Sequence, residues 1–193
     1  FMRLYPDLKI DLTLTDAIVD IRHERIDVAI RSGKLSDPSL VAHELSANER
    51  LVCASPAYLE AHGVPADPGA LVDHPCLKLN FESRFNDWEF RTSTSRTIPI
   101  EGGFTCNSLD AIRTLCLAGM GIARLPRYMV NEDVQAGRLI PLLQAFSSPS
   151  TSAIYALRAA GDYVPAKTRV FIAFLAERIT AACLNEHPSS RQP

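Results

Sequence analysis

The sequence predicts an α/β protein. Within the first 33 residues a helix end, a strand, a helix and a second strand follow one another with short links. Further along, short apolar runs continue to alternate with helices that begin at capping residues. Such alternation is typical of a parallel sheet with crossover helices. The 193 residues are 47% hydrophobic and 22% charged, a balance that suits a globular chain long enough to bury a core.

The first elements follow from local patterns. Residues 1–6 resemble the last turn of a helix ended by Pro6, so the chain looks cut at its start. Residues 9–14 alternate apolar and polar side chains, which predicts a half-buried strand. Thr15 and Asp16 offer a cap for a helix that ends near Glu24. Residues 26–30 form a short apolar run and predict the next strand.

The rest of the chain continues in the same manner. We expect strands at 40–45, 50–54, 76–80, 122–125, 139–143 and 153–157, and a hairpin that pairs 88–90 with 97–100. We expect helices at 55–62, 107–119, 126–136 and 165–184, and a short helical turn within 65–73. Gly119 or Gly121 would end the second of these helices. Residues 185–193 are polar and predict a mobile tail.

Composition and motifs exclude several functions. A net charge of -2 lacks the basic excess with which nucleic-acid binders neutralise phosphates. No run of about 18 apolar residues predicts a membrane span. The sequence contains no GxSxG, HExxH, Walker A or GxGxxG motif, and its five histidines are scattered. We therefore expect a protein that is not an enzyme and holds no metal or cofactor.

The five cysteines are odd in number and form no CxxC pair. This pattern indicates reduced, mostly buried thiols. A redox-sensing pair formed by distant cysteines stays open as an alternative.

Polar residues follow the predicted strands at three corners: 13–16, 31–33 and 107–108. In open α/β sheets, ligands bind outside the carboxyl ends of strands, where helix N-termini point. Backbone N–H groups, hydroxyls and a guanidinium together suit a small carboxylate. The simpler alternatives are that Thr15 and Ser108 only cap helices and that Arg31 only pairs with an acid. Asp16 and Asp110 weaken the case, because an acid in the first turn competes with a bound anion.

Six segments, in order, resemble the effector domain of LysR-type transcriptional regulators. They are residues 5–12 (YPDLKIDL), 26–31 (IDVAIR), 51–59 (LVCASPAYL), 117–126 (LAGMGIARLP), 136–143 (AGRLIPLL) and 165–175 (PAKTRVFIAFL). The resemblance runs from Phe1 to about Ile179. It implies a two-lobed fold like that of type-2 periplasmic-binding proteins, with two Rossmann-like lobes joined by hinge strands. Lobe I would comprise residues 1–78 and 150–184, and lobe II residues 79–149.

The resemblance also implies a function. A small-molecule effector, which we expect to be a carboxylate, would bind in the cleft between the lobes of a cytoplasmic homodimer or homotetramer. The implied contacts are Thr15, Arg31, Ser32, Phe81, Asn107, Ser108 and Arg124. Phe81, Phe85 and Trp88 would admit an aromatic body. DNA would be bound only through a winged helix-turn-helix domain, which this sequence does not contain.

One family element is missing from the sequence. The first strand of lobe I, which in this fold lies between the strands predicted at 9–14 and 26–30, has no counterpart. We expect its place to be filled by residues outside this sequence, by another chain, or by nothing; direct pairing of the two strands would contradict this. Two alternatives to a regulator remain: a secreted solute-binding protein, which five unpaired cysteines disfavour, and an enzyme on the same fold.

Overall fold

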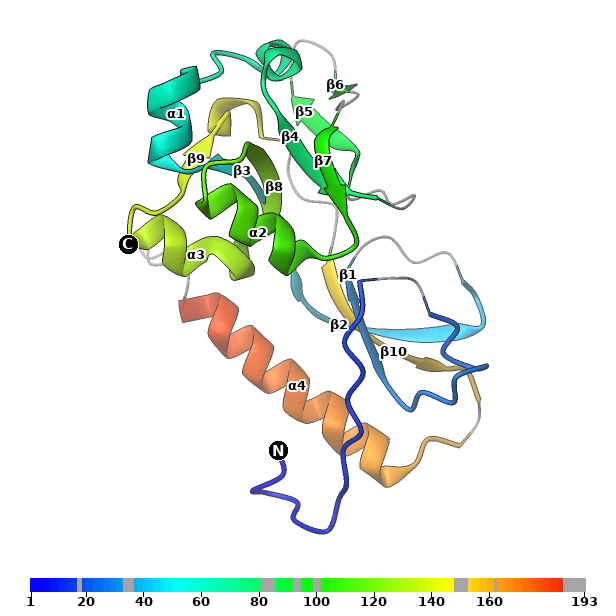
Figure 1. The fold of residues 1–193 in the computed structure, drawn as a ribbon. Helices are drawn as coiled ribbons and strands as arrows, with labels where there is room; N and C mark the ends of the chain where they lie inside the picture. The colour runs from blue at the N-terminus through cyan, green and yellow to red at the C-terminus, as the bar shows by residue number, and fades with distance from the viewer. Residues whose placement is uncertain are drawn as a thin grey trace, which may run out of the picture. The chain divides into compact units, whose positions relative to one another are not determined.

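A computed structural model describes residues 1–16, 19–32, 37–80, 86–91, 95–98, 102–147, 153–161 and 163–185 (Figure 1). The chain forms two compact units. The first comprises residues 1–48 and 151–193, and the second comprises residues 49–150.

The first unit contains a three-stranded antiparallel sheet in the order β1-β10-β2, built from β1 (Ala29–Ser32), β2 (Leu40–Ala47) and β10 (Ala153–Ala159). The long helix α4 (Ala166–Asn185) packs against this sheet (Figure 1). Leu45, Ala156 and Ile172 form the centre of the small core between them. Because Ile172 comes from the helix and the other two from the sheet, burial of these side chains holds the two layers together.

The second unit is built on a five-stranded mixed sheet in the order β7-β4-β8-β3-β9. Its strands are β3 (Arg50–Ala54), β4 (Cys76–Leu79), β7 (Gly102–Cys106), β8 (Ile122–Pro126) and β9 (Ile140–Leu142). β7, β4 and β8 run parallel, whereas β3 runs antiparallel to β8 and to β9. The carboxyl ends of three strands therefore meet at one edge of this sheet.

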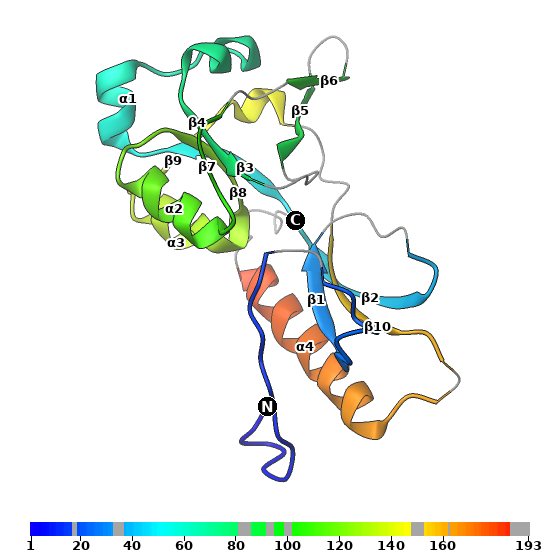
Figure 2. The same cartoon turned by 45° about the vertical axis from the view of Figure 1, so that its right-hand side comes forward.

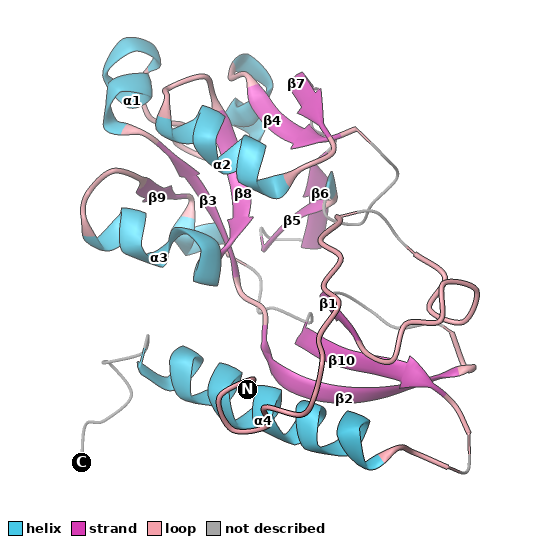
Figure 3. Cartoon of the chain, turned by 60° about the horizontal axis from the view of Figure 1, so that its bottom comes forward, coloured by secondary structure: helices cyan, strands magenta, loops and turns pink. Residues whose placement is uncertain are grey.

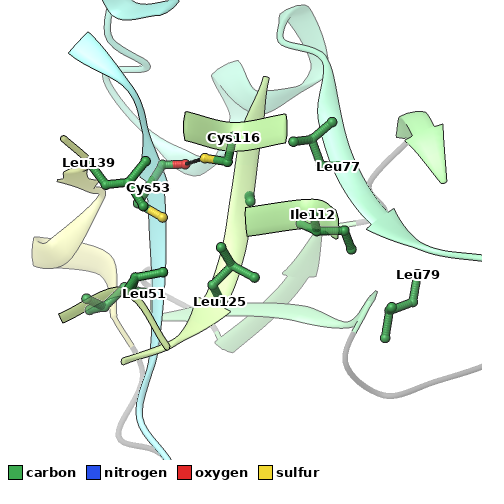
Figure 4. Packing of buried hydrophobic residues seen from close by; sticks show 10 residues of the cluster. Leu51, Cys53, Leu77, Leu79, Ile112, Cys116, Leu125 and Leu139 are labelled. Atoms are coloured by element: carbon green, nitrogen blue, oxygen red, sulfur yellow. Dashed lines mark hydrogen bonds between the residues drawn. The ribbon is translucent and has the colours of Figure 1, made fainter. Parts of the chain in front are cut away.

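Both faces of this sheet are covered. Helices α2 (Leu109–Leu117) and α3 (Arg127–Gln135) lie side by side on one face (Figure 2). Figure 4 shows the core beneath them, where Ile112 and Cys116 of α2 pack with Leu51, Leu77 and Leu125 of the strands. The other face is covered by α1 (Pro56–His62), the 3-10 turn η1 (Pro68–Asp73), strand β5 (Trp88–Arg91) of the hairpin with β6 (Ser95–Ile98), and the 3-10 turn η3 (Gln144–Phe146).

Local chemistry explains why most expected elements are confirmed. Helix α1 begins where the Ser55 hydroxyl accepts a hydrogen bond from the Tyr58 N–H at 3.3 Å and ends at Gly63, whose φ is +82°. Helix α2 begins at Ser108, whose hydroxyl lies 3.5 Å from the Ala111 N–H. These caps use short-range signals, which a sequence displays directly.

The start of the chain differs from the expectation. Residues 9–14 form no strand, and Figure 3 draws this stretch as loop. Leu12 and Leu14 are 73% and 84% exposed. Strand β1 pairs with β10, and no described strand lies along its other edge. The alternating pattern of 9–14 is that of a strand, but a strand needs a neighbour to satisfy its backbone groups, and none of the described residues provides one there.

Two further expectations for this region were wrong. The helix expected from Asp16 to Glu24 is, in its described part, a single turn in which the Asp20 carboxylate accepts from the Arg22 and His23 N–H groups. Arg25 ends it with a left-handed φ of +55°. So short a helix is not stable without packing. The parallel sheet expected from the first 33 residues is also not found, because β1 pairs antiparallel with β10, which comes from far along the chain.

Strand β7 has no counterpart among the expected strands, and it contains Gly102 and Gly103, which have low strand propensity. The structure explains one of these glycines. A Cβ on Gly103 would lie 3.3 Å from the Cβ of Pro75, so the close approach of β7 to the start of β4 requires a small residue.

The boundary between the units differs from the expected lobe boundary at residue 78. The second unit begins at Glu49, because β3 and β4 both belong to its five-stranded sheet. The expected mobile tail lies outside the described residues, apart from Asn185 at the end of α4.

Candidate functional site

The carboxyl edge of the second unit's sheet gathers several of the polar residues singled out in the sequence. β7 ends at Cys106, directly before Asn107 and Ser108, and β8 carries Arg124 at its middle, two residues before its end. β4 ends one residue before Asn80, whose N–H donates to the Cys106 carbonyl at 2.8 Å. This edge is where ligands bind in open α/β sheets. We call it the carboxyl-edge site.

The helix start at this edge is organised by local hydrogen bonds. The Ser108 side chain caps α2, as the simpler alternative proposed, and the Cys106 thiol donates to the Ser108 carbonyl at 3.3 Å. Asn107 is exposed, and Asp110 stands in the first turn of the helix. At this helix start the Asn107 side chain is therefore open to water, whereas the Ser108 hydroxyl already accepts a hydrogen bond from the backbone.

Arg124 lies on the opposite face of the sheet from α2. Its neighbours in the chain, Ala123 and Leu125, pack beneath α2, so strand alternation directs Arg124 toward the face covered by β5. There its Nη1 donates to the Asp87 carbonyl at 2.6 Å. Burial lowers the pKa of the Arg124 guanidinium.

Arg50, which the sequence analysis did not single out, lies on the same face. β3 and β8 are antiparallel neighbours in which Arg50 stands opposite Pro126 and Val52 opposite Arg124. Burial, and next the positive charge of Arg124, lower the pKa of Arg50 to about 10. A pKa of about 10 leaves Arg50 charged at neutral pH. The only signal in the sequence is an arginine at the start of an apolar strand; the antiparallel register that brings it near Arg124 cannot be read there.

The remaining predicted contacts belong to the first unit or are not described. Arg31 is half-buried on β1, and its Nη2 donates to the Val19 carbonyl at 2.6 Å. Ser32 ends the same strand and is exposed, and Thr15 is exposed in the loop that follows residues 9–14. Phe81 and Phe85 lie outside the described residues. Trp88 of β5 is buried in the core of the second unit.

The described residues offer neither a metal-binding cluster nor a membrane-spanning helix. Within the described ranges, no group of three His, Cys, Asp or Glu side chains could hold a metal ion. In the same part of the chain no helix is long and apolar enough to cross a membrane.

A groove lies away from the predicted residues. It is in the first unit, where residues 4–8 meet the start of α4. Its lining consists of Leu4, Tyr5, Pro6, Asp7, Leu8, Ala166, Lys167 and Val170. Its lining is mostly apolar and contains none of the predicted contacts.

The described cysteines differ in accessibility. Cys53, Cys76 and Cys116 are buried, whereas Cys106 is half-buried. The Cys116 thiol donates to the Cys53 carbonyl at 3.4 Å (Figure 4). Burial raises the pKa of Cys76 to about 12, and the Cys116 side chain together with burial raises the pKa of Cys53.

We expect Cys106 to be modified by a thiol reagent well before Cys53, Cys76 and Cys116. The thiolate is the reactive form, and raised pKa values keep Cys53 and Cys76 protonated. Burial keeps all three of the latter thiols, Cys116 included, out of reach of the reagent. Mass spectrometry of peptides after timed alkylation at pH 8 measures this order, with denatured protein as the control in which all cysteines react. Rapid modification of Cys53 in the folded protein would contradict it.

Comparison with known structures defines the class of this protein. The regulatory domain of CrgA, a LysR-type transcriptional regulator from Neisseria meningitidis, superposes with a TM-score of 0.84 at 32% identity over 92% of this chain and 87% of that one. The full-length structure of AphB, a virulence activator of Vibrio cholerae, gives a TM-score of 0.77 at 30% identity over 92% of this chain and 60% of that one. The fold is therefore that of a regulatory domain of a transcriptional regulator.

The sequence comparisons identify the family. A family profile described as the LysR substrate binding domain matches residues 1–180. CrgA of Neisseria meningitidis is 33% identical over 179 residues, which are 93% of this chain and 60% of that protein. The chain thus belongs to the LysR substrate-binding domain family and is the effector-binding domain of a LysR-type regulator. It spans about 60% of the length of the curated relatives, which are transcriptional regulators and give no support to a secreted solute-binding protein.

Proposed function

We propose that this domain binds a small anionic effector and transmits its binding to a DNA-binding domain elsewhere in the full-length protein. The protein would act in the cytoplasm as a homodimer or homotetramer and would not catalyse a reaction. One observation supports the proposal: Asn107 and Ser108 directly follow β7, and Arg124 lies on β8, a strand of the same sheet that runs in the same direction, in a chain of the LysR substrate-binding domain family. Thr15, Arg31, Ser32 and Phe81 remain predicted effector contacts.

The chemistry of the carboxyl-edge site supports an anion. Guanidinium, amide and hydroxyl groups donate hydrogen bonds to carboxylate oxygens, and the start of α2 adds a partial positive charge. Asp110 in its first turn offsets part of that charge, so we assign the main attraction to arginine.

A thermal-shift screen of small carboxylates, aromatic acids and sugars tests the proposal. An effector at about 100 times its dissociation constant adds about 2.7 kcal/mol, which should raise the melting temperature by about 5–10 °C. We expect Asn107→Ala and Arg31→Ala to reduce this shift. The shift of each variant is measured from the melting temperature of that variant without ligand, because loss of the hydrogen bond from Arg31 to the Val19 carbonyl alters stability by itself.

Glu60→Gln, an exposed change on α1, serves as the matched control and should leave the shift unchanged. A panel that gives no shift with a cooperatively melting sample would contradict an effector of these classes.

A further inference from the structure

Arg50 and Arg124 form a pair on one face of the second unit's sheet. On that face, Val52 and Ile122 pack in the core that also contains Trp88 and Phe90 of β5. Because side chains two apart on a strand share a face, Arg50 projects on the same side as Val52, and Arg124 on the same side as Ile122. The register places the two arginines as diagonal neighbours, roughly 7–8 Å apart at Cα. Both are half-buried.

Two like charges held this closely on a partly buried face repel one another. Among the described residues, two acids raise the pKa of both arginines: Asp87, directly before β5, and Glu89, on β5; both are exposed. Water screens exposed carboxylates, so they offset the arginine charges only in part. Burial is the main cause of the lowered pKa of both arginines, and at Arg50 the positive charge of Arg124 lowers the pKa further.

The hydrogen bond that Arg124 makes to a backbone carbonyl also leaves the positive charge of its guanidinium in place. Its Nη1 donates to a backbone carbonyl, that of Asp87, which fixes the direction of the guanidinium without removing its charge. A guanidinium carries five N–H donors, so one bond of this kind leaves most of the donors of Arg124 available to a second acceptor. A held guanidinium also loses less freedom when a ligand binds.

We propose that Arg50 and Arg124 together bind a small dianion, either a dicarboxylate or a phosphate monoester. This inference rests on the proposed function and narrows it, because it makes the effector doubly charged and adds Arg50 to its contacts. A dianion places one negative charge against each guanidinium and removes the repulsion between them. A monoanion can compensate only one of the two charges.

The experiment compares dianions with matched monoanions. Succinate and phenyl phosphate are the dianionic probes, and monomethyl succinate and methyl phenyl phosphate are the same skeletons with one charge blocked. Binding is measured by calorimetry at constant ionic strength, so that general screening does not differ between probes. In the wild-type protein we expect at least one dianion to bind about tenfold or more tightly than its blocked partner, since the lost charge-assisted hydrogen bond contributes about 1.5–3 kcal/mol.

Three variants assign the effect to the pair. Arg50→Gln should weaken the dianion about 10- to 100-fold and abolish the preference over the monoanion. Arg50→Lys keeps the charge and should retain part of the affinity. Arg91→Gln, an exposed arginine on β5, removes an equal charge from the same unit and should change nothing. Circular dichroism confirms that each variant is folded.

The outcomes separate the two ligand sources and the two proposals. Preference for succinate identifies a dicarboxylate site, and preference for phenyl phosphate a phosphate site. Equal binding of blocked and unblocked probes, binding unaffected by Arg50→Gln, or no binding of either dianion would overturn the inference. If the wider screen finds a neutral or monoanionic ligand whose binding does not change in Arg50→Gln, the inference of a dianion site is also overturned. The proposed function would then remain intact.

Discussion

Replacing Asp133 by asparagine is expected to lower the free energy of unfolding by about 3 kcal/mol. Asp133 of α3 is only 1% exposed, and each of its carboxylate oxygens faces one arginine. Oδ2 lies 2.6 Å from Nη2 of Arg113 on α2, and Oδ1 lies 2.7 Å from Nη2 of Arg138 in the turn that leads to β9. An asparagine would remove the negative charge and turn an amide donor toward one of the two guanidiniums.

The cost lies near the lower end for a buried ion pair, because Arg113 and Arg138 are partly exposed and regain water when the carboxylate is lost. Urea unfolding followed by circular dichroism measures the change, provided that the slope of the transition is unaltered. Arg138→Gln is the control: that side chain is 55% exposed, so its loss should cost about 1 kcal/mol or less. An Asp133→Asn protein within about 1 kcal/mol of wild type would show that the triad does not hold α2 and α3 together.

The parts of the fold that could be predicted from the sequence depend on neighbouring residues. The Ser55 and Ser108 caps, the Pro56 helix start and the hairpin of β5 and β6 each use signals within a few positions. The parts that could not be predicted depend on distant partners. Residues 9–14 carry a strand pattern without a neighbouring strand, and β1 takes its neighbour from residues 153–159.

The residues of the candidate site also divide into those that the sequence indicates and those that only the pairing of distant strands reveals. Asn107 and Ser108 are recognisable because they open a well-marked helix. Arg50 is not, because its place beside Arg124 follows from antiparallel pairing of β3 with β8, although Arg50 and Arg124 are 74 positions apart in the sequence. Nor does a sequence indicate that Arg31 holds the Val19 carbonyl or that Trp88 is buried. Side-chain direction depends on register, and register is set by the whole sheet.

Gly121→Ala is the second substitution with a large expected effect. The sequence suggested Gly119 or Gly121 as a helix stop, and Gly119, with a φ of +77°, fits that role. At position 121 a glycine is required for a different reason, which is close approach to the backbone of Pro75. A Cβ at this position would overlap the carbonyl oxygen of Pro75 and lie 3.2 Å from its carbonyl carbon. The same oxygen accepts a hydrogen bond from the Ile122 N–H at 2.9 Å, at the start of the β4–β8 pairing.

The obstacle is backbone, so it cannot rotate away as a side chain would. Alanine at 121 must separate the starts of β4 and β8 or break the bond to Pro75, and we expect a loss of about 3 kcal/mol or more in the free energy of unfolding. Gly137→Ala is the matched control: its φ is +67° and nothing lies within 4 Å of its Cβ, so only the backbone cost of about 1 kcal/mol applies. Denaturant unfolding of both variants separates the two effects. Equal losses for both variants would mean that close approach to Pro75 contributes nothing, and the glycine at 121 would then reflect backbone freedom alone.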